Sequence, residues 1–335
     1  MRIRNRLFGL LFGVVLFGFT AYLLLDTFVI VHKIATVETT AVRGDAVVEA
    51  ETTTIEIVPV ESAETETASA EERAEATETL FVSSEEPATV ETETTESTYR
   101  DENITVTLTD YRLHDTTVHV ADVTVTSPEY LKTAFAQSTY GRNVTQKTST
   151  IASSVNAILA INGDYYGAQR AGYVIRNGVL YRATASKNAE DLVIYRDGSF
   201  GIINESEITA EELLESGAWD VLSFGPALVE NGEIAVTESE EVGRAMASNP
   251  RTAIGVIGEG HYVFIVCDGR TDESAGLSLY ELAAFMQSLG VTTAYNLDGG
   301  GSSSMVFLGN VVNVPTTNGN NSKERSVSDI VYIGY

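Results

Sequence analysis

Four short segments place polar side chains next to apolar runs, where the packing of a core does not explain them. Their carboxylates, arginines, amides, phenols and glycines together suit chemistry on a sugar or a phosphate. A carboxylate can act at a sugar carbon as nucleophile or base, and an arginine can grip phosphate through paired hydrogen bonds. The segments are Asn162-Gly163-Asp164-Tyr165-Tyr166-Gly167, Asn249-Pro250-Arg251-Thr252, Cys267-Asp268-Gly269-Arg270 and the glycine-rich stretch 294–306.

The glycine-rich stretch is the most specific of the four. It contains Asp298-Gly299-Gly300-Gly301-Ser302 between two apolar runs, which makes a flexible linker a poor explanation. Glycines permit backbone angles closed to other residues, and their amides can line an anion site beside the Asp298 carboxylate. The stretch is not a phosphate-binding P-loop, because no Gly-Lys-Ser/Thr follows it.

Simpler explanations stay open for the other three segments. The first can be a turn with two half-buried tyrosines, and Arg251 can belong to an ordinary surface ion pair. The segment 267–270 can be a type I turn with solvated charges. Cys267, the only cysteine, ends an apolar run and is expected to be buried.

The three aspartates also allow a metal site. With amide or backbone oxygens, Asp164, Asp268 and Asp298 would form a hard-oxygen set suited to Ca²⁺ or Mg²⁺. They lack EF-hand spacing and must converge from distant positions, and the sequence requires no cofactor. The four histidines show no paired ligand spacing, so each is expected to be structural or exposed: His32, His114, His119 and His261.

The elements that must position these segments are mostly strands. Alternating or continuous apolar patterns predict strands at 104–109, 117–126 and 157–161. Asn-Gly, Asp-Gly and Gly-Glu-Gly sequences predict hairpin turns at 177–178, 197–198, 231–232 and 258–260. Helical patterns are fewer, at 149–156, 210–216 and 278–289. The predicted fold is α+β, a mixed, mainly antiparallel sheet with a few packed helices.

The N-terminal region has a different character. Residues 1–6 carry three arginines, and 7–25 contain no charge. Nineteen helical residues span roughly 28 Å, close to the thickness of a bilayer core. We therefore expect residues 7–31 to form an uncleaved transmembrane signal-anchor, with residues 1–6 cytoplasmic and the rest extracellular. A cleaved signal peptide would have a shorter apolar run.

The following region is strongly acidic. Between residues 38 and 102 there are 17 Glu and 2 Asp against three Arg, with few large apolar groups. Such a composition predicts a disordered stalk over residues 32–102. The whole chain of 335 residues has a net charge of -26, which argues against a general nucleic-acid partner. Residues 103–335 are long enough to form the folded domain.

Together, the four segments resemble the phosphodiester glycosidase family, whose bacterial members are often labelled as exopolysaccharide-biosynthesis proteins. The resemblance covers about residues 100–335, and the order and spacing of its elements make it specific. Asp164 departs from the small residue expected in many relatives, which leaves the chemistry of that position open. The matching elements are Asn162–Tyr166, Pro250-Arg251-Thr252-Ala253-Ile254-Gly255, Asp268-Gly269-Arg270, Leu279–Gly290, Leu297–Ser303 and Glu324-Arg325-Ser326-Val327.

The resemblance implies hydrolysis of a sugar-1-phosphodiester at its glycosidic bond, on cell-wall or exopolysaccharide material at a bacterial plasma membrane. The implied catalytic carboxylate is Asp298, followed by Asp268 and then Asp164. The substrate would be held by Asn162, Tyr165, Tyr166, Arg251, Arg270, Gly299, Gly300, Gly301, Ser302 and Arg325. Two alternatives remain: a non-catalytic glycan-binding or exopolysaccharide assembly protein, and a metal-dependent phosphodiesterase that cleaves the phosphorus–oxygen bond.

Overall fold

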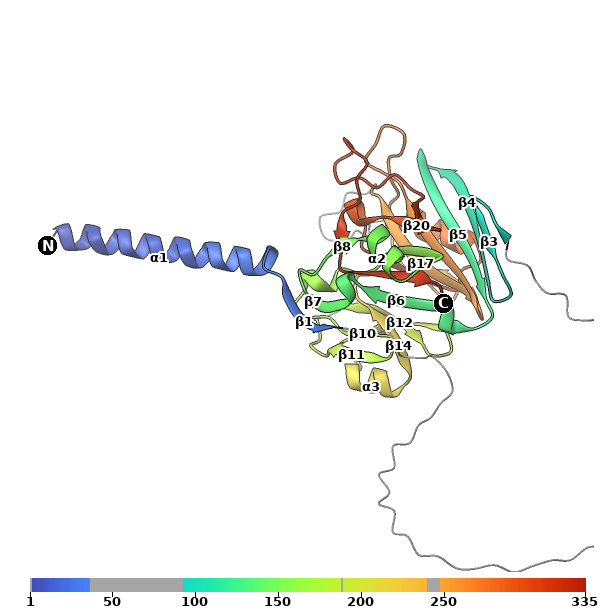
Figure 1. Ribbon diagram of the computed structural model, residues 1–335, viewed down its shortest axis with the longest axis horizontal. Helices are drawn as coiled ribbons and strands as arrows, with labels where there is room; N and C mark the ends of the chain where they lie inside the picture. Colours follow the sequence, from blue (N-terminus) through green and yellow to red (C-terminus); the bar gives the residue numbers. More distant parts are fainter. Residues whose placement is uncertain (1, 37–92, 188, 240–247) are drawn as a thin grey trace, which may run out of the picture. The chain divides into compact units, whose positions relative to one another are not determined.

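Three antiparallel sheets and three short helices form the folded part of the chain (Figure 1). The computed structural model describes residues 2–36, 93–187, 189–239 and 248–335. The predicted α+β fold with a mainly antiparallel sheet is confirmed. Among the strands in these ranges every pairing is antiparallel, so the parallel part of the predicted mixed sheet is not found.

The first sheet has nine strands and supplies most of the candidate site. Its hairpin turns at 231–232 and 258–260 are those predicted from Asn-Gly and Gly-Glu-Gly. In order across the sheet the strands are β16 (Glu233–Ile234), β15 (Ala227–Glu230), β19 (Thr293–Leu297), β17 (Arg251–Gly258), β18 (His261–Cys267), β5 (Thr116–Val125), β4 (Ile104–Leu113), β3 (Thr98–Arg100) and β2 (Glu93–Thr94).

The other two sheets have five strands each. The second is β21 (Asn310–Val311), β20 (Met305–Phe307), β9 (Leu159–Asn162), β23 (Asp329–Ile333) and β6 (Leu131–Phe135). The third is β11 (Val179–Arg182), β10 (Val174–Arg176), β14 (Ala218–Leu222), β12 (Glu190–Tyr195) and β13 (Phe200–Asn204). Two short pairs complete the strands: β1 (His32–Thr36) with β7 (Thr139–Arg142), and β22 (Ser326–Val327) with β8 (Gln146–Lys147).

The helices match the predicted ones within two residues at each end. They are α2 (Thr148–Ser154), α3 (Ala210–Glu215) and α4 (Leu279–Ser288), with short 3₁₀ turns η1 (Pro128–Tyr130), η2 (Ala136–Ser138), η3 (Tyr166–Ala168) and η4 (Gly300–Ser302). A capping box fixes the start of α4: the Ser278 hydroxyl accepts from the Glu281 amide, and the Glu281 carboxylate accepts from the Ser278 amide. The helix buries Leu282 and Met286 in a cluster that also contains Cys267, as expected for that cysteine.

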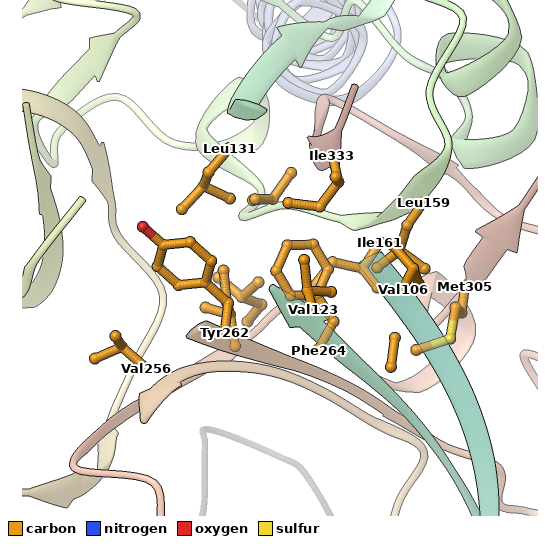
Figure 2. Packing of buried hydrophobic residues seen from close by; sticks show 14 of the residues in the cluster. Val106, Val123, Leu131, Leu159, Ile161, Val256, Tyr262, Phe264, Met305 and Ile333 are labelled. Carbon is orange, nitrogen blue, oxygen red and sulfur yellow. The ribbon is translucent and has the colours of Figure 1, made fainter. Parts of the chain in front are cut away.

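The main core lies between the first and second sheets. Figure 2 shows Val123 and Phe264 of the nine-stranded sheet beside Leu131, Ile161 and Ile333 of the second sheet. All five side chains are fully buried. Burial of each such side chain stabilises the fold by roughly 1.5–3 kcal/mol relative to its exposure. The two sheets are therefore held in one fixed relation, and so are the strand ends that carry the site.

The N-terminal expectations have a different outcome. A helix, α1 (Arg2–Phe28), does form over 27 residues. Among the described residues no helix is long and apolar enough to cross a membrane, so the predicted span at 7–31 is not found. Strands β1, β2 and β3 lie inside the predicted stalk 32–102. Residues 37–92 of that stalk fall outside the described residues.

One buried guanidinium links the second and third sheets. Arg176 at the end of β10 donates from Nε and Nη2 to the Asp329 carboxylate at 3.0 and 2.7 Å, and from Nη2 to Asp164 at 2.9 Å. Nη1 donates to the backbone carbonyls of Ile175 and Val221. Burial and the neighbouring Asp164 raise the pKa of Asp329 well above its usual range. Arg176 is thus the cation that makes two buried carboxylates tolerable.

We predict that Arg176→Met lowers the free energy of unfolding by about 3–5 kcal/mol, because it leaves two buried carboxylates without their cation. Denaturant unfolding followed by tryptophan fluorescence measures the change. Arg112→Met is the matched control, since Arg112 is exposed and its Nη1 donates one 3.2 Å hydrogen bond to the Thr117 hydroxyl. Equal midpoints for both variants would show that the buried cluster does not stabilise the fold.

Candidate active site

The antiparallel order of the nine-stranded sheet brings three of the polar segments to one edge. Arg251 begins β17, and its backbone pairs with Cys267 at the end of β18. On the other side of β17, Thr252 pairs with Leu297 at the end of β19. Because neighbouring strands run in opposite directions, the start of β17 lies between the ends of β18 and β19. The residues that follow those two ends therefore meet Arg251.

A pocket of about 270 Å³ opens at this edge. A second hollow of about 470 Å³ beside it shares Arg270 but is lined by neither Arg251 nor Asp298. We take the smaller pocket as the candidate site, because the predicted arginines, carboxylate and glycines surround it. Its lining residues are Phe224, Asn249, Pro250, Arg251, Arg270, Asn296, Leu297, Asp298, Gly299, Gly300, Gly301 and Arg325.

Three arginines converge on the pocket. Arg251 is buried, and its Nε donates to the Leu277 carbonyl at 2.9 Å. Arg270 and Arg325 are exposed at the rim. Partial burial, followed by the positive charges of Arg325 and Arg251, lowers the pKa of Arg270. Three positive charges around one pocket favour the binding of an anion, as the resemblance implied for Arg251 and Arg270.

Asp298 is the carboxylate of this pocket. Burial raises its pKa, against the opposing effects of the Ser302 hydroxyl, the Arg325 charge and the Gly299 amide. The same Asp298 charge contributes to raising the pKa of Tyr165, after burial, and so places that phenol near it. Asp298 and the predicted partners Ser302, Tyr165 and Arg325 thus belong to one site.

Two of the three glycine amides expected to line an anion site are used within the fold. The Gly300 amide donates to the Pro250 carbonyl at 2.8 Å, and the Gly299 amide serves Asp298 itself. Their contribution is close approach: a Cβ on Gly300, whose φ is +60°, would lie 2.9 Å from Nη2 of Arg270. Larger residues would push the arginine out of the pocket.

Asn162 supports the site from behind instead of holding a sugar. Its Nδ2 donates to the Asp298 carbonyl at 2.6 Å. Its Oδ1 accepts from the Thr252 hydroxyl at 2.8 Å and from the Ser304 amide at 3.1 Å. The Asn162 side chain is not part of the pocket lining, because both of its ends are used within the fold. Asn162 fixes the backbone that carries Asp298.

Asp164 and Tyr166 are also absent from the pocket. Asp164 is fully buried, where it accepts from Arg176, from the Tyr166 amide and from the Ser223 amide, each at 2.9 Å. Tyr166 packs in an aromatic cluster with Phe135 and Tyr140. After β9 the chain turns both side chains into the protein, so neither lies where the prediction placed it.

Tyr165 differs from its neighbour. It is half-buried, and its ring lies 5.2 Å from that of Phe224, centroid to centroid, in an edge arrangement. Phe224 lines the pocket, so Tyr165 packs against a pocket-lining ring. Of the predicted Asn-Gly-Asp-Tyr-Tyr segment, Tyr165 is the side chain with a contact to a residue of the pocket lining; its contact with substrate stays a prediction.

Asp268 lies at the correct strand end but faces away from the pocket. One carboxylate oxygen lies 3.2 Å from Nε2 of His119, and the other accepts from the Val314 amide at 2.8 Å. His119 also contacts Asp110 through Nδ1 at 2.7 Å. Burial alone would raise the pKa of Asp268, but its contacts with His119 and the loop lower it. The second-choice catalytic carboxylate is therefore a structural one.

The three aspartates do not assemble a metal site. Asp164 and Asp268 have separate hydrogen-bond partners, and only Asp298 lines the pocket. Within the described part of the chain, no group of three or more His, Cys, Asp or Glu residues is arranged to hold a metal ion. The predicted Ca²⁺ or Mg²⁺ ligand set is not formed, because each acid ends a different strand with a different environment.

The pocket also contains polar and aromatic side chains that the sequence did not predict as site residues, although two of them, Asn249 and Asn296, lie inside predicted segments. Asn249 holds Arg270 in place by accepting from its Nη2 at 2.9 Å. Asn296 lies on β19, two residues before Asp298, and a strand period of two puts both side chains on one face. This spacing of two residues between Asn296 and Asp298 could be read from the sequence. Phe224 follows β14 and has no pattern that would reveal it.

Comparison with known proteins agrees with this geometry. A family model described as phosphodiester glycosidase matches residues 155–334. The SPbeta prophage-derived uncharacterized protein YomE of Bacillus subtilis is 29% identical over 201 residues, 58% of this chain and 31% of that protein. Mouse N-acetylglucosamine-1-phosphodiester alpha-N-acetylglucosaminidase is 29% identical over 172 residues, 47% of this chain and 33% of that protein. The chain thus spans about a third of the length of these relatives.

Two solved structures share the fold. The catalytic domain of zebrafish N-acetylglucosamine-1-phosphodiester alpha-N-acetylglucosaminidase, auto-inhibited by its pro-peptide, superposes with a TM-score of 0.56 at 21% identity, over 74% of this chain and 88% of that one. A hypothetical protein from Synechocystis gives 0.53 at 17% identity, over 70% and 62%. At these identities the likeness is evidence for the fold alone.

We predict that inorganic phosphate binds in this pocket and that Arg270→Gln weakens its binding on the order of tenfold or more, because a charge-assisted hydrogen bond is lost. Titration calorimetry at fixed ionic strength measures the dissociation constant. Arg196→Gln is the matched control: this exposed arginine lies 4.9 Å from the Trp219 ring, outside the pocket. The same loss in both variants would mean that general charge, not the pocket, attracts phosphate.

Proposed function

Since the chain belongs to the phosphodiester glycosidase family, we propose that its pocket hydrolyses a sugar-1-phosphodiester at the glycosidic carbon–oxygen bond. The observation that carries the proposal is the convergence of Arg251, Arg270 and Arg325 on the same pocket as Asp298. Arginines suit a phosphodiester, and a carboxylate suits the anomeric carbon beside it.

The chemistry fits a single carboxylate. A phosphate monoester is a better leaving group than an alkoxide, and the arginines stabilise the charge it gains, so a strong general acid is not needed. Retaining and inverting glycosidases both normally use two carboxyl groups, whereas among the described residues Asp298 is the carboxylate that lines the pocket. Since the leaving group removes the need for the acid, we propose that Asp298 acts as the base for a direct attack by water.

In the proposed step, water loses a proton to the Asp298 carboxylate while the water oxygen bonds to the anomeric carbon. The bond from that carbon to the phosphate oxygen breaks, and its electron pair leaves with the phosphate toward Arg251 and Arg270. The products are the free sugar, with inverted configuration, and a phosphomonoester.

We predict that a sugar-1-phosphodiester gives free sugar and a phosphomonoester, and that Asp298→Asn lowers kcat at least 100-fold, because the amide cannot accept the proton. Proton NMR of the first products shows the anomer, and a phosphate assay with phosphatase shows the monoester. Burial raises the pKa of Asp298, so the acid limb of kcat/KM should lie above the ordinary value of about 4, and activity should rise with pH through it.

Asp268→Asn is the matched control for this substitution, because Asp268 contacts His119 and does not line the pocket. Its kcat should stay within a few-fold of wild type. Sugar-1-phosphate as the product, suppressed by chelator, would identify a metal-dependent phosphodiesterase. Tight glycan binding without turnover would identify a binding or assembly protein.

We further propose that the domain lies at the outer face of a bacterial plasma membrane and acts on cell-wall or exopolysaccharide material. The apolar run at 7–25, preceded by arginines, and the acidic composition of residues 38–102 support this placement. We predict that the full chain sediments with membranes, that external protease digests it on intact cells, and that deleting residues 2–31 releases it. A full chain that stays soluble and protected from protease contradicts this placement.

A further inference from the structure

Asn296 is the buried amide on the inner wall of the pocket. Its side chain is 1% exposed, and it lines the pocket together with Asp298. The backbone of Asn296 is fixed on one side by pairing with Ala253 of β17 and on the other by donation to the Pro226 carbonyl at 3.1 Å. The position of this side chain is therefore set by the sheet.

The orientation of the amide is fixed as well. Nδ2 donates to the Gly225 carbonyl at 2.8 Å. The opposite orientation would place two carbonyl oxygens against each other, so the NH₂ group must face Gly225. Oδ1 is then the end that remains, and no group among the described residues donates a hydrogen bond to it.

This open acceptor distinguishes Asn296 from the two other asparagines of the site. Oδ1 of Asn162 accepts from Thr252 and Ser304, and Oδ1 of Asn249 accepts from Arg270. A buried acceptor without a donor costs about 1–3 kcal/mol. Such a cost at the wall of a ligand pocket is explained if the ligand supplies the donor.

The chemistry of the substrate decides which part of it can do so. A phosphodiester carries only acceptor oxygens at neutral pH, and the three arginines suit those. A sugar carries hydroxyl or amide N–H donors. We propose that Asn296 is a specificity-determining residue, whose Oδ1 accepts a hydrogen bond from one hydroxyl or amide N–H of the sugar while the arginines hold the phosphate. This inference rests on the function proposed above.

The test compares a parent sugar-1-phosphodiester with a set of analogues, each lacking one hydroxyl or amide donor. With the wild-type chain, one analogue should lose about 10–100-fold in kcat/KM, because it leaves Oδ1 buried and unsatisfied. With Asn296→Ala the parent should fall by a similar factor, and that analogue should show no further loss. Asn249→Ala is the matched control: it weakens the support of Arg270 but should keep the wild-type discrimination.

Three results would overturn the inference. The first is that the wild-type chain hydrolyses every analogue with a kcat/KM within about three-fold of that for the parent. This result does not depend on how any variant folds. Asn296→Ala can keep the same discrimination, which would mean that water fills the place of the donor or that another residue contacts the sugar. If the wild-type chain turns over no sugar phosphodiester at all, the proposed function fails and this inference fails with it. Denaturation midpoints and phosphate affinity of each variant show whether the pocket remains intact.

Discussion

The candidate site depends on one buried ion cluster that it does not contain. Arg176 neutralises Asp329 and Asp164, and the backbone beside these acids leads directly to the pocket. The Asp329 carbonyl accepts from the Gly163 amide at 3.0 Å, and the Gly163 carbonyl accepts from the Asp298 amide at 3.3 Å. Asp164 meanwhile holds the amide of Ser223, next to the pocket residue Phe224. The cluster thus fixes two sides of the pocket through short backbone links.

Both the charges around the pocket and the space left by its glycines determine what the pocket can bind. Arginines gather where glycines leave room: Gly300 lets the Arg270 guanidinium lie against the backbone, and Asn249 holds it there. The lone carboxylate, Asp298, is held by its backbone on one side and surrounded by Ser302 and Arg325 on the other. A phosphate leaving group and one carboxylate form a consistent pair, because the first removes the need for a second acid.

Seven of the predicted site residues line the pocket: Arg251, Arg270, Asp298, Gly299, Gly300, Gly301 and Arg325. Asp298, Arg251 and Arg270 could be predicted because they stand at strand ends, which an antiparallel sheet brings to one edge. Asp164 and Asp268 stand near strand ends too, yet their partners Arg176 and His119 look like ordinary strand residues, and His119 is 149 residues away from Asp268. Which way a side chain turns after a strand depends on such partners. Hairpins and helices were predictable because their signals are local.

The site also has a consequence for how the protein reaches its active form. Its parts come from positions near 162, 225, 250, 270, 298 and 325, and no two neighbouring parts in this series lie within about fifteen residues of each other in the chain. Contacts of such long sequence separation form late and slowly, because loop closure must precede them. A folding intermediate in which these distant segments have not yet met therefore lacks the complete pocket.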